Sequence, residues 1–260
     1  MATHQAVDFQ GIVISRSDYK ERDMLVKILT DKFGIKTFFV RGARKRGFKL
    51  AAAILPFSHG TYFGTVHDTG LSFISGTREL DQYQRIFTEI ELNAYASYIL
   101  GLATAAFGTD QALPPLWFTK IFTAINLIDE GLDPAIITNI IEIQLLETFG
   151  VKPSLESCVI CQNTQAPFDF SETYGGILCQ RHWHLDPHRL HLDQRTVYYL
   201  RLFSVVDLTQ LHSIKVKEST KKALRKTLDA IYSDQVGVFV KAKKFLDQMS
   251  GWEQLLKKDD

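Results

Sequence analysis

The stretch Ile35-Lys-Thr-Phe-Phe-Val-Arg41 shows the architecture of the N-terminal part of the chain most directly. It is a short run rich in β-branched and aromatic residues, and Asp31-Lys-Phe-Gly34 before it has the composition of a hairpin connection. Four similar runs surround it, with a second turn signal at residues 67–70, and these runs cover residues 11–16, 24–30, 56–66 and 71–76. Five short strands within about 70 residues predict a small closed barrel of the OB-fold kind, and an SH3-like barrel is the alternative with a similar pattern.

A run of positive charge follows this strand. The nine residues from Arg41 to Lys49 carry five positive charges and no acid. Guanidinium and ammonium groups neutralise phosphates and release counterions, and Gly42 and Gly47 keep a loop adaptable. The sequence therefore predicts a phosphate-contacting loop between the third and fourth strands, and an ordinary solvated loop is the alternative. The candidate side chains are Arg41, Arg44, Lys45, Arg46 and Lys49.

The two adjacent phenylalanines of this strand must point in opposite directions. Side chains alternate along a strand, so Thr37, Phe39 and Arg41 share one face, and Phe38 lies on the other. One ring therefore faces away from the barrel interior. We expect Phe39 to be an outward aromatic beside arginine, which is a base-stacking arrangement, and packing against a second domain is the alternative.

The hydrophobic period changes to that of helices after Leu80. One long helix is predicted from Tyr83 to Leu102, and the uncharged stretch 92–109 fits a buried core helix better than a membrane span because several polar residues interrupt it. Further helices are predicted over residues 116–130, 133–149, 192–206, 217–232 and 235–249. Asp133 is the expected cap of the second of these. Apolar residues expected to face a core in the last one are Val236, Phe239, Val240, Phe245 and Leu246. The predicted class is α+β, with an OB-fold domain over residues 1–80 and a helical domain over residues 81–260.

All three cysteines lie in one short region. Cys158-Val-Ile-Cys161 is followed, after seventeen residues, by Cys179-Gln-Arg-His182. Two close pairs of soft ligands joined by a short connector are what tetrahedral zinc requires. We predict a structural Zn²⁺ site within residues 154–186, held by Cys158, Cys161, Cys179 and His182, with His184 as the alternative fourth ligand. A redox Cys-x-x-Cys pair and two buried thiols beside a chance repeat are the competing interpretations.

The net charge of +1 hides a segregation along the chain. Residues 1–80 carry twelve Lys and Arg against seven Asp and Glu, whereas residues 81–157 carry three against ten. A polyanion-binding surface is therefore expected outside the middle segment. The odd cysteine count favours a reducing compartment, and residues 1–10 show no secretion signal.

The order of these features resembles the bacterial recombination mediator family RecO. Gly11-Ile-Val-Ile-Ser-Arg16, Tyr19-Lys-Glu-Arg-Asp23 and Leu25-Val-Lys-Ile-Leu-Thr30 are similar to the first two strands of that family. The run Phe39-Val-Arg-Gly-Ala-Arg44 and then Leu55-Pro-Phe57 look like the rest of its barrel. Two later segments resemble its junction with the zinc region and its last helix, and these are Glu142-Ile-Gln-Leu-Leu-Glu-Thr-Phe-Gly150 and Lys243-Lys-Phe-Leu246.

This resemblance implies a DNA repair protein without enzymatic turnover, acting in the cytoplasm at the nucleoid. It implies binding of single- and double-stranded DNA, annealing of complementary strands, and help in loading recombinase onto strands coated by single-strand DNA-binding protein. The implied partners are RecR and the acidic, hydrophobic tail of the single-strand DNA-binding protein. Zinc-bearing members usually have four cysteines, and His182 stands where the fourth would be.

Two other functions fit parts of the sequence. A zinc hydrolase or deaminase needs an open metal position and a nearby base, and the chain contains neither H-x-E nor H-E-x-x-H. A zinc-stapled protein-interaction adaptor without direct DNA annealing fits better, because a mediator must also bind proteins. The lysine-rich segment around Lys217 and Lys226 would suit an acidic peptide, a phosphate backbone or plain solvent.

Overall fold

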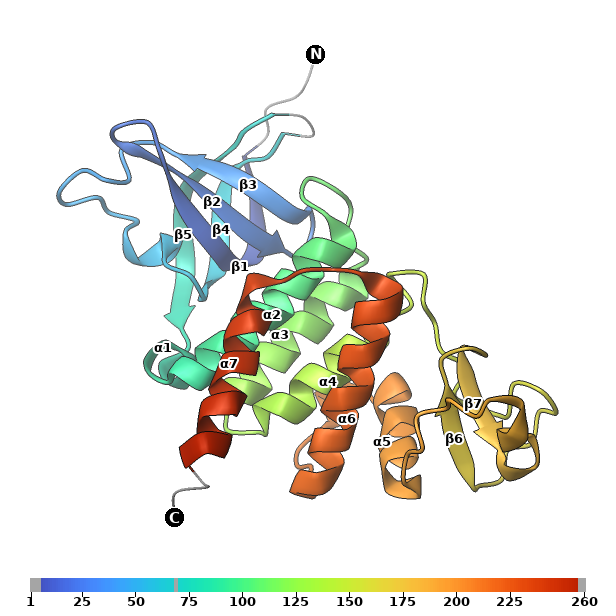
Figure 1. Cartoon of the computed structure of the whole chain (residues 1–260). Helices are drawn as coiled ribbons and strands as arrows, with labels where there is room; N and C mark the ends of the chain where they lie inside the picture. The colour runs from blue at the N-terminus through green and yellow to red at the C-terminus, as the bar shows by residue number, and fades with distance from the viewer. Residues whose placement is uncertain (1–5, 68–69, 257–260) are drawn as a thin grey trace. The chain divides into compact units, whose positions relative to one another are not determined.

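The chain folds into two compact units, shown in the computed structural model of Figure 1. The structure describes residues 6–67 and 70–256, with the side chains of residues 250–256 left aside, and the middle of the predicted turn at 67–70 lies outside this part. Unit 1 holds the residues up to Glu130 together with those from Val240 onward, and unit 2 holds Gly131–Phe239.

Unit 1 begins with a closed five-stranded barrel. Its strands are β1 (Ala6–Tyr19), β2 (Asp23–Thr30), β3 (Gly34–Val40), β4 (Ser58–Thr65) and β5 (Ser72–Gln82). They follow the order β1-β2-β3-β5-β4, and β1 closes the barrel against β4. Only β3 and β5 pair in parallel, while the other pairs are antiparallel. The predicted OB-fold is confirmed, and this strand order favours it over an SH3-like barrel.

Aromatic rings fill the barrel interior. The ring of Phe9 stacks on Phe38 at 5.2 Å between centroids and on Tyr62 at 5.9 Å. The Tyr62 hydroxyl donates to the carbonyl of Ala53 at 2.8 Å, so its polar end is satisfied inside the core. Ala53 belongs to the short 3₁₀ helix η1 (Ala52–Ile54) that precedes β4. Because Phe38 is fully buried, the alternation along β3 turns Phe39 to the outer face.

Four α-helices accompany the barrel in the described part of unit 1, and the first predicted helix is corrected. They are α1 (Gln84–Thr88), α2 (Ile90–Phe107), α3 (Pro115–Asp129) and α7 (Lys241–Leu256). The single helix predicted from Tyr83 to Leu102 breaks at Glu89, whose backbone is extended. The carboxylate of Asp129, at the end of α3, accepts from the backbone N–H groups of Gln84, Arg85 and Ile86. This long-range cap makes α1 a separate turn.

The buried helix expected between residues 92 and 109 is present as α2. Its residues Ala96, Ile99 and Ala103 are fully buried, and α7 packs along it. Gly101 marks the close approach, since a Cβ there would lie 2.4 Å from a methyl carbon of Val240. Within the described part of the chain, no helix combines the length and apolar character needed to cross a bilayer.

The last predicted helix, 235–249, is also corrected. Residues Tyr232–Val236 form a π-helical turn (η4), Gly237 ends it with φ +67°, and α7 begins only at Lys241. Leu246 is buried as expected. Phe239 lies in the connection and is 76% exposed, and Phe245 is 38% exposed, so the prediction that these two rings face a core is wrong.

Unit 2 combines three helices with a small β-hairpin. The helices are α4 (Pro134–Leu145), α5 (Gln194–Val205) and α6 (Glu218–Ile231), and the hairpin is β6 (Phe168–Ser171) with β7 (Gly176–Cys179). Helix α4 packs against both α5 and α6, and β6 packs against α5. Asp133 caps α4 as predicted, accepting from the N–H groups of Ala135 and Ile136. The 3₁₀ helices η2 (Gln180–Leu185) and η3 (Leu208–Gln210) connect these elements.

Candidate metal centre and nucleic-acid interface

The four predicted metal ligands come together in unit 2. Their ligand atoms all lie within 4.8 Å of one another. The Cys161 and Cys179 sulfurs are 3.8 Å apart, and His182 Nδ1 lies 3.6 Å from Cys158 Sγ and 3.3 Å from Cys179 Sγ. A tetrahedral zinc with Zn–S bonds of ~2.3 Å and a Zn–N bond of ~2.0 Å separates its ligand atoms by roughly 3.5–3.8 Å. The donor set therefore has the size and chemistry of a tetrahedral metal site.

Two tight backbone segments position these ligands. Cys158 and Cys161 sit on one turn, closed by hydrogen bonds from Gln162 N–H to Cys158 O at 2.9 Å and from Cys158 N–H to Asn163 O at 2.8 Å. Cys179 ends β7, and η2 begins directly after it and carries His182. The N–H of Val159 donates to Ile177 O at 3.0 Å, which ties the first turn to the second strand.

Two glycines precede Cys179: Gly175 ends the β6–β7 connection, and Gly176 begins β7. Gly175 has φ +62°, which favours glycine. At Gly176 a Cβ would lie 2.5 Å from the carbonyl oxygen of Ser154, so the strand and the segment before Cys158 approach too closely for a side chain.

The electrostatics around Cys158 suit a thiolate. Burial raises the pKa of this thiol. Hydrogen bonds from the backbone groups of Cys179, Cys161 and Ile160 lower the pKa by more than burial raises it, and the result is a pKa of about 6. A thiolate is the form that binds a metal. His184 lies outside the four-ligand group, and its ring centroid is 6.5 Å from that of His182. The structure thus places His182, rather than His184, with the three cysteines.

A second polar network supports the same region independently of a metal. Buried Asp169 pairs with Arg189 at 2.9 Å, and Arg189 also covers the ring of Trp183. Asp186 is buried and accepts hydrogen bonds from the hydroxyl of Ser171 and the N–H of His188. The metal centre is therefore built on a hairpin that has its own buried contacts.

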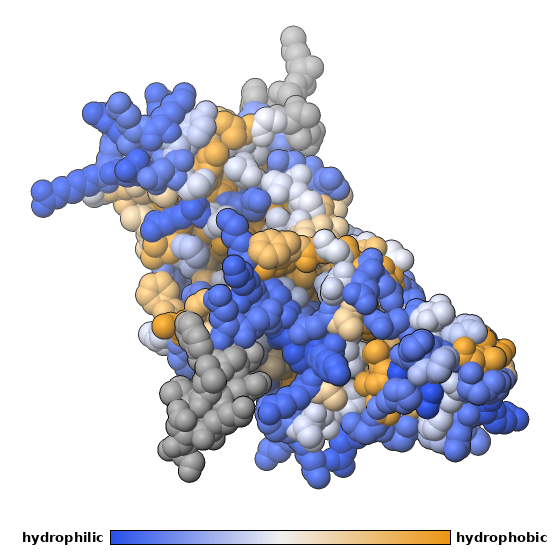
Figure 2. Space-filling view, in the orientation of Figure 1, coloured by the Kyte–Doolittle hydropathy of each residue, from blue (hydrophilic) through white to orange (hydrophobic). Residues whose placement is uncertain are grey.

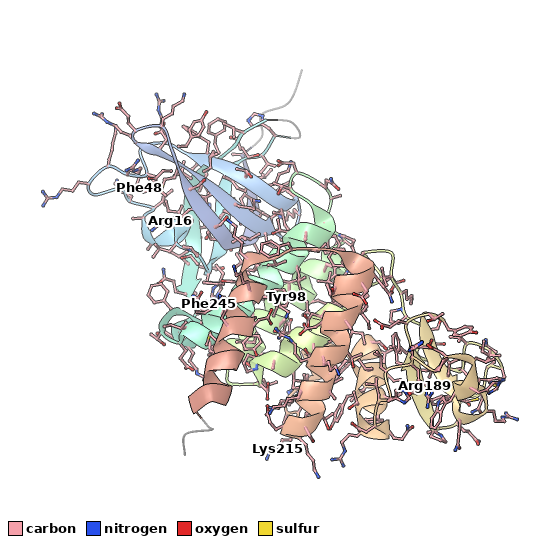
Figure 3. The ribbon with its side chains drawn as sticks, in the orientation of Figure 1. Arg16, Phe48, Tyr98, Arg189, Lys215 and Phe245 are labelled. Carbon is pink, nitrogen blue, oxygen red and sulfur yellow. The ribbon has the colours of Figure 1, made fainter. Side chains whose placement is uncertain are left out.

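The basic loop lies at one end of the barrel in unit 1. All five predicted cationic side chains are exposed, and long hydrophilic side chains project from this end of the barrel in Figure 2. The N–H of Gly42 donates to Asp23 Oδ1 at 2.7 Å, and Phe48, labelled in Figure 3, packs against the barrel core. The loop is thus anchored to the barrel by Gly42 and Phe48, while its charged side chains face solvent.

One of the five cations has a partner. Arg44 pairs with Asp18 of β1 at 3.2 Å, across an exposed surface where such pairs contribute little. Among residues 6–67 and 70–256, Arg41, Lys45, Arg46 and Lys49 form no ion pair.

Phe39 belongs to a row of aromatic rings on the outer face of the barrel. Its ring lies 5.8 Å from that of Tyr19 and 5.7 Å from that of Phe73, both in edge-to-face contact. Phe73 also meets the ring of His67 at 6.0 Å and is 41% exposed. These rings, called the aromatic row below, are Tyr19, Phe39, Phe73 and His67.

Sequence reasoning found only one member of this row. Phe39 and Phe73 are direct partners in the β3–β5 ladder, which joins strands more than thirty residues apart. Their pairing depends on barrel closure, so no local period reveals it. Knowledge of the OB-fold strand order would have placed the start of β5 beside β3 and thus identified Phe73.

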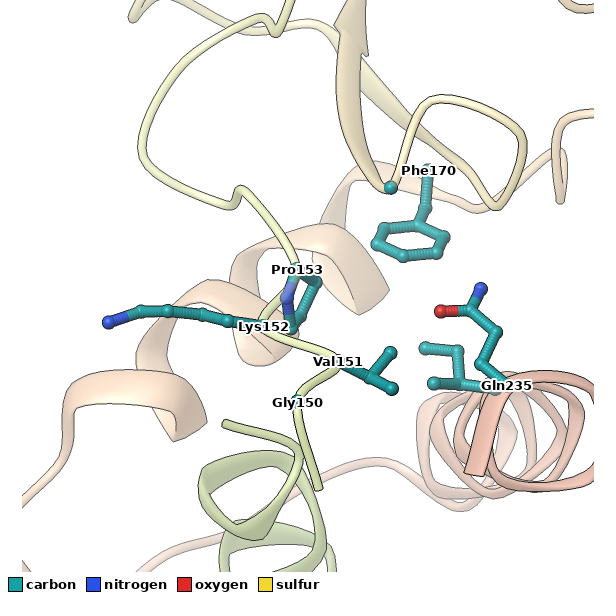
Figure 4. A pocket seen from close by; sticks show the side chains of 8 residues that line it. Gly150, Val151, Lys152, Pro153, Phe170 and Gln235 are labelled. Atoms are coloured by element: carbon teal, nitrogen blue, oxygen red, sulfur yellow. The ribbon is translucent and has the colours of Figure 1, made fainter. Parts of the chain in front are cut away.

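Unit 2 also contains an open cavity of about 300 Å³ (Figure 4). The side chains of Val151, Pro153 and Phe170 line it, and that of Lys152 points away from them. The remaining lining residues are Gly150, Gly175, Ile231 and Gln235. None of the eight is a carboxylate, histidine or cysteine, so the cavity lacks the usual groups for acid–base or nucleophilic chemistry.

Comparisons with known proteins agree along nearly the whole chain. The family model described as Recombination protein O N terminal matches residues 1–83, and Recombination protein O C terminal matches residues 88–244. A protein named DNA repair protein RecO from Ligilactobacillus salivarius is 58% identical over 98% of this chain and 99% of its own length. Proteins of the same name are 54% identical in Levilactobacillus brevis, over 96% of both chains, and 46% identical in Enterococcus faecalis, over 95% of this chain and 94% of theirs.

Proposed function

The chain belongs to the RecO family of DNA repair proteins, and we propose that it binds single- and double-stranded DNA and anneals complementary strands without enzymatic turnover. We further propose that it helps load recombinase onto strands coated by single-strand DNA-binding protein. RecR and the acidic, hydrophobic tail of the single-strand DNA-binding protein are its proposed partners. Its proposed place of action is the cytoplasm, at the nucleoid.

The observation that carries this proposal is the position of the basic loop beside the aromatic row. Arg41 directly follows β3 and stands two residues after the outward-facing Phe39, so the basic loop begins next to the aromatic row. Cationic side chains neutralise phosphates, and exposed rings stack on bases without selecting their sequence. This combination is what a protein needs to bind strands of any sequence.

We propose that residues 1–80 form the nucleic-acid-binding domain and that residues 81–260 form the helical domain that carries the zinc-binding segment. The proposed DNA contacts are Arg41, Arg44, Lys45, Arg46, Lys49 and Phe39. In residues 154–186 the proposed cofactor is a structural Zn²⁺ held by Cys158, Cys161, Cys179 and His182. When bound, this ion would fix the geometry of the two ligand turns.

Four protein ligands fill a tetrahedral zinc, which leaves no position for a reactive water. This donor set disfavours the zinc hydrolase interpretation. A protein-interaction adaptor remains the second candidate, because the cavity lined by Val151, Pro153 and Phe170 offers an apolar surface within unit 2. An adaptor of that kind would bind partner proteins while showing no DNA affinity of its own.

The salt dependence of DNA binding tests the loop assignment. If all five side chains contact phosphates, they contribute about −3.5 to the log–log salt slope on single strands, so a fourfold salt increase costs roughly 100-fold in affinity. Replacing Arg41, Arg44, Lys45, Arg46 and Lys49 by alanine should remove most of this slope. Fluorescence anisotropy of a labelled oligonucleotide at several salt concentrations measures it.

The matched control keeps the five positive charges and replaces the three guanidinium groups by ammonium groups. Arg41→Lys, Arg44→Lys and Arg46→Lys together preserve five positive charges, so the slope should stay close to that of the wild type. An alanine variant with an unchanged slope would mean that the loop does not contact DNA. A wild-type chain that binds partner proteins but no oligonucleotide would favour the adaptor instead.

A further inference from the structure

A second cluster of positively charged residues lies in one part of unit 2. Residues 195–226 carry eight Lys and Arg against two Asp and Glu, whereas residues 131–194 carry three against eight. The basic part comprises α5, the connection after it and most of α6, and α5 packs directly against α6. The lower end of this unit in Figure 2 is accordingly hydrophilic.

Structure divides the cations of α6 into two groups. Lys221 pairs with Asp133, and Arg225 pairs with Asp229 one turn along the helix. Lys222 and Lys226 instead are exposed, and in the described part of the chain neither forms an ion pair. They are four residues apart, which places them one above the other on the same helix face. Thr220, Leu224 and Leu228 bury the opposite face, so these lysines must point to solvent.

Helix α5, which packs against α6, carries exposed aromatic surface of its own. Tyr198 of α5 is 59% exposed, and its ring contacts that of Tyr199 at 5.4 Å. The Tyr199 hydroxyl donates to the carbonyl of Lys215 at 3.3 Å, which holds the start of the segment leading into α6 against α5. Lys215, labelled in Figure 3, and Lys217 are also exposed. We call this surface the tyrosine–lysine face, and it comprises Tyr198, Tyr199, Lys215, Lys217, Lys222 and Lys226.

We propose that the tyrosine–lysine face is a second binding site for single-stranded nucleic acid. The inference rests on the proposed function. Annealing must bring two strands together, and the tyrosine–lysine face would bind the second of them. Two phosphate backbones repel each other, so a protein that holds only one strand leaves that repulsion in place. A second cationic site neutralises the incoming strand and raises its effective concentration beside the first.

The rings favour nucleic acid over an acidic peptide as the occupant. Lysines alone would serve either polyanion, because a carboxylate and a phosphate both pair with ammonium. The exposed ring of Tyr198, on the helix that packs against α6, adds a stacking surface, which every base can use. Lys222, Lys226 and Tyr198 are also side chains that α6 and α5 can lose without disturbing a buried contact, since all three are exposed.

The test is capture of a second strand by the full-length chain. The protein is first bound to a short immobilised oligothymidine, and binding of a labelled second oligothymidine, which cannot pair with it, is then measured at several salt concentrations. Lys222→Ala with Lys226→Ala should leave first-strand affinity within about twofold. Second-strand capture should weaken, and because two phosphate contacts carry a slope of about −1.4, a fourfold salt increase should cost the wild type about sevenfold more than the variant.

Lys241→Ala with Lys244→Ala is the matched control, since it removes two exposed lysines from α7 in unit 1. It should capture the second strand as the wild type does. Tyr198→Ala tests the stacking surface separately, and it should weaken second-strand capture on the order of tenfold while leaving the salt dependence unchanged.

Each outcome has a distinct meaning. If the Lys222/Lys226 variant captures the second strand as well as the control, this inference is wrong while the proposed function stands. If the variant loses only the binding of a labelled oligoglutamate peptide, the face docks acidic protein segments and the inference is again wrong. If the wild type fails to bind even the first strand, the proposed function itself fails.

Discussion

Single side chains define the metal centre, and Cys158 is the most telling of them. Cys158→Ser removes one of four donor atoms that lie within 4.8 Å of one another. We expect loss of bound zinc and a lower free energy of unfolding, by about 4 kcal/mol where free zinc exceeds the wild-type Kd by 1,000-fold. Elemental analysis of the purified protein and urea unfolding with and without a chelator measure both effects.

The matched control for this variant is His184→Ala. His184 lies outside the four-ligand group, so zinc content and stability should stay as in the wild type. Oligonucleotide binding by Cys158→Ser should also stay within about twofold, because the metal ligands and the proposed DNA contacts belong to different compact units and share no partner residue. If strand annealing disappeared while zinc and fold remained, a structural role for the metal would be refuted.

The outer rings of the barrel give a second prediction for single residues. Phe39→Ala and Phe73→Ala should each weaken single-strand binding by about 1–3 kcal/mol if each ring stacks on a base. The salt slope should not change, because no charge is removed. Phe87→Ala in α1 is the control, since Phe87 is a 59% exposed ring away from the aromatic row. Equal losses in all three variants would argue against a specific stacking site.

At the scale of secondary-structure elements, the start of α5 gives a prediction that depends on pH. The Asp193 carboxylate accepts from the N–H groups of Arg195 and Thr196 and from the Thr196 hydroxyl. The hydroxyl bond is the main reason that the pKa of Asp193 is lowered. A lowered pKa means that its stabilisation is present above the ordinary Asp pKa of ~3.9 and is lost as pH falls through the folded value.

Asp193→Ala should therefore reduce the free energy of unfolding by about 1 kcal/mol at pH 7, and this difference should shrink on acidification below pH ~4. Asp193→Asn keeps a capping oxygen and should cost less. Urea unfolding of the three proteins across a pH series measures the difference. A gap between wild type and Asp193→Ala that stayed constant down to pH 2 would contradict this account.

The elements also show what sequence reasoning could and could not supply. The five strands and the Asp133-capped helix were predictable because their signals are local, namely alternation, turn residues and a capping side chain. The break at Glu89 was not, because the short helix before it, α1, is capped by Asp129, more than forty residues away from the capped N–H groups. Likewise β7 is buried on every residue and its sequence lacks the alternation that identifies a strand, and β6 spans only four residues, so its alternation is a weak signal.

The candidate sites follow the same rule, because only residues linked by a local pattern were predictable from the sequence. Cys158, Cys161, Cys179 and His182 were identifiable because ligand spacing within each pair is local. The aromatic row was only partly identifiable, because it forms across strands that meet in the closed barrel. The tyrosine–lysine face was predictable only as a lysine-rich segment, since its tyrosines lie on α5, which packs against α6, and Tyr199 reaches the segment through its hydrogen bond to Lys215.

At the scale of the whole molecule, the chain returns to unit 1 at its end. Helix α7 packs on α2 and buries Leu246, although unit 2 separates the two helices in sequence. A chain that ends at Phe239 should therefore lose stability in unit 1 while unit 2 keeps its own. Pulsed hydrogen exchange should show faster exchange in α2 and unchanged exchange in α4 and α6. Uniform destabilisation of both units would contradict the division.

This return has a consequence for how the protein is synthesised. The roughly 110 residues of Gly131–Phe239 leave the ribosome after α2 and before α7. About 130 residues in all separate the end of α2 from the start of α7, so at about 5–20 residues per second the apolar surface of α2 around Gly101 waits roughly 7–27 s for the helix that covers it. During that interval the nascent chain exposes an apolar surface that chaperones can bind. Unit 2 can complete its fold before unit 1 does.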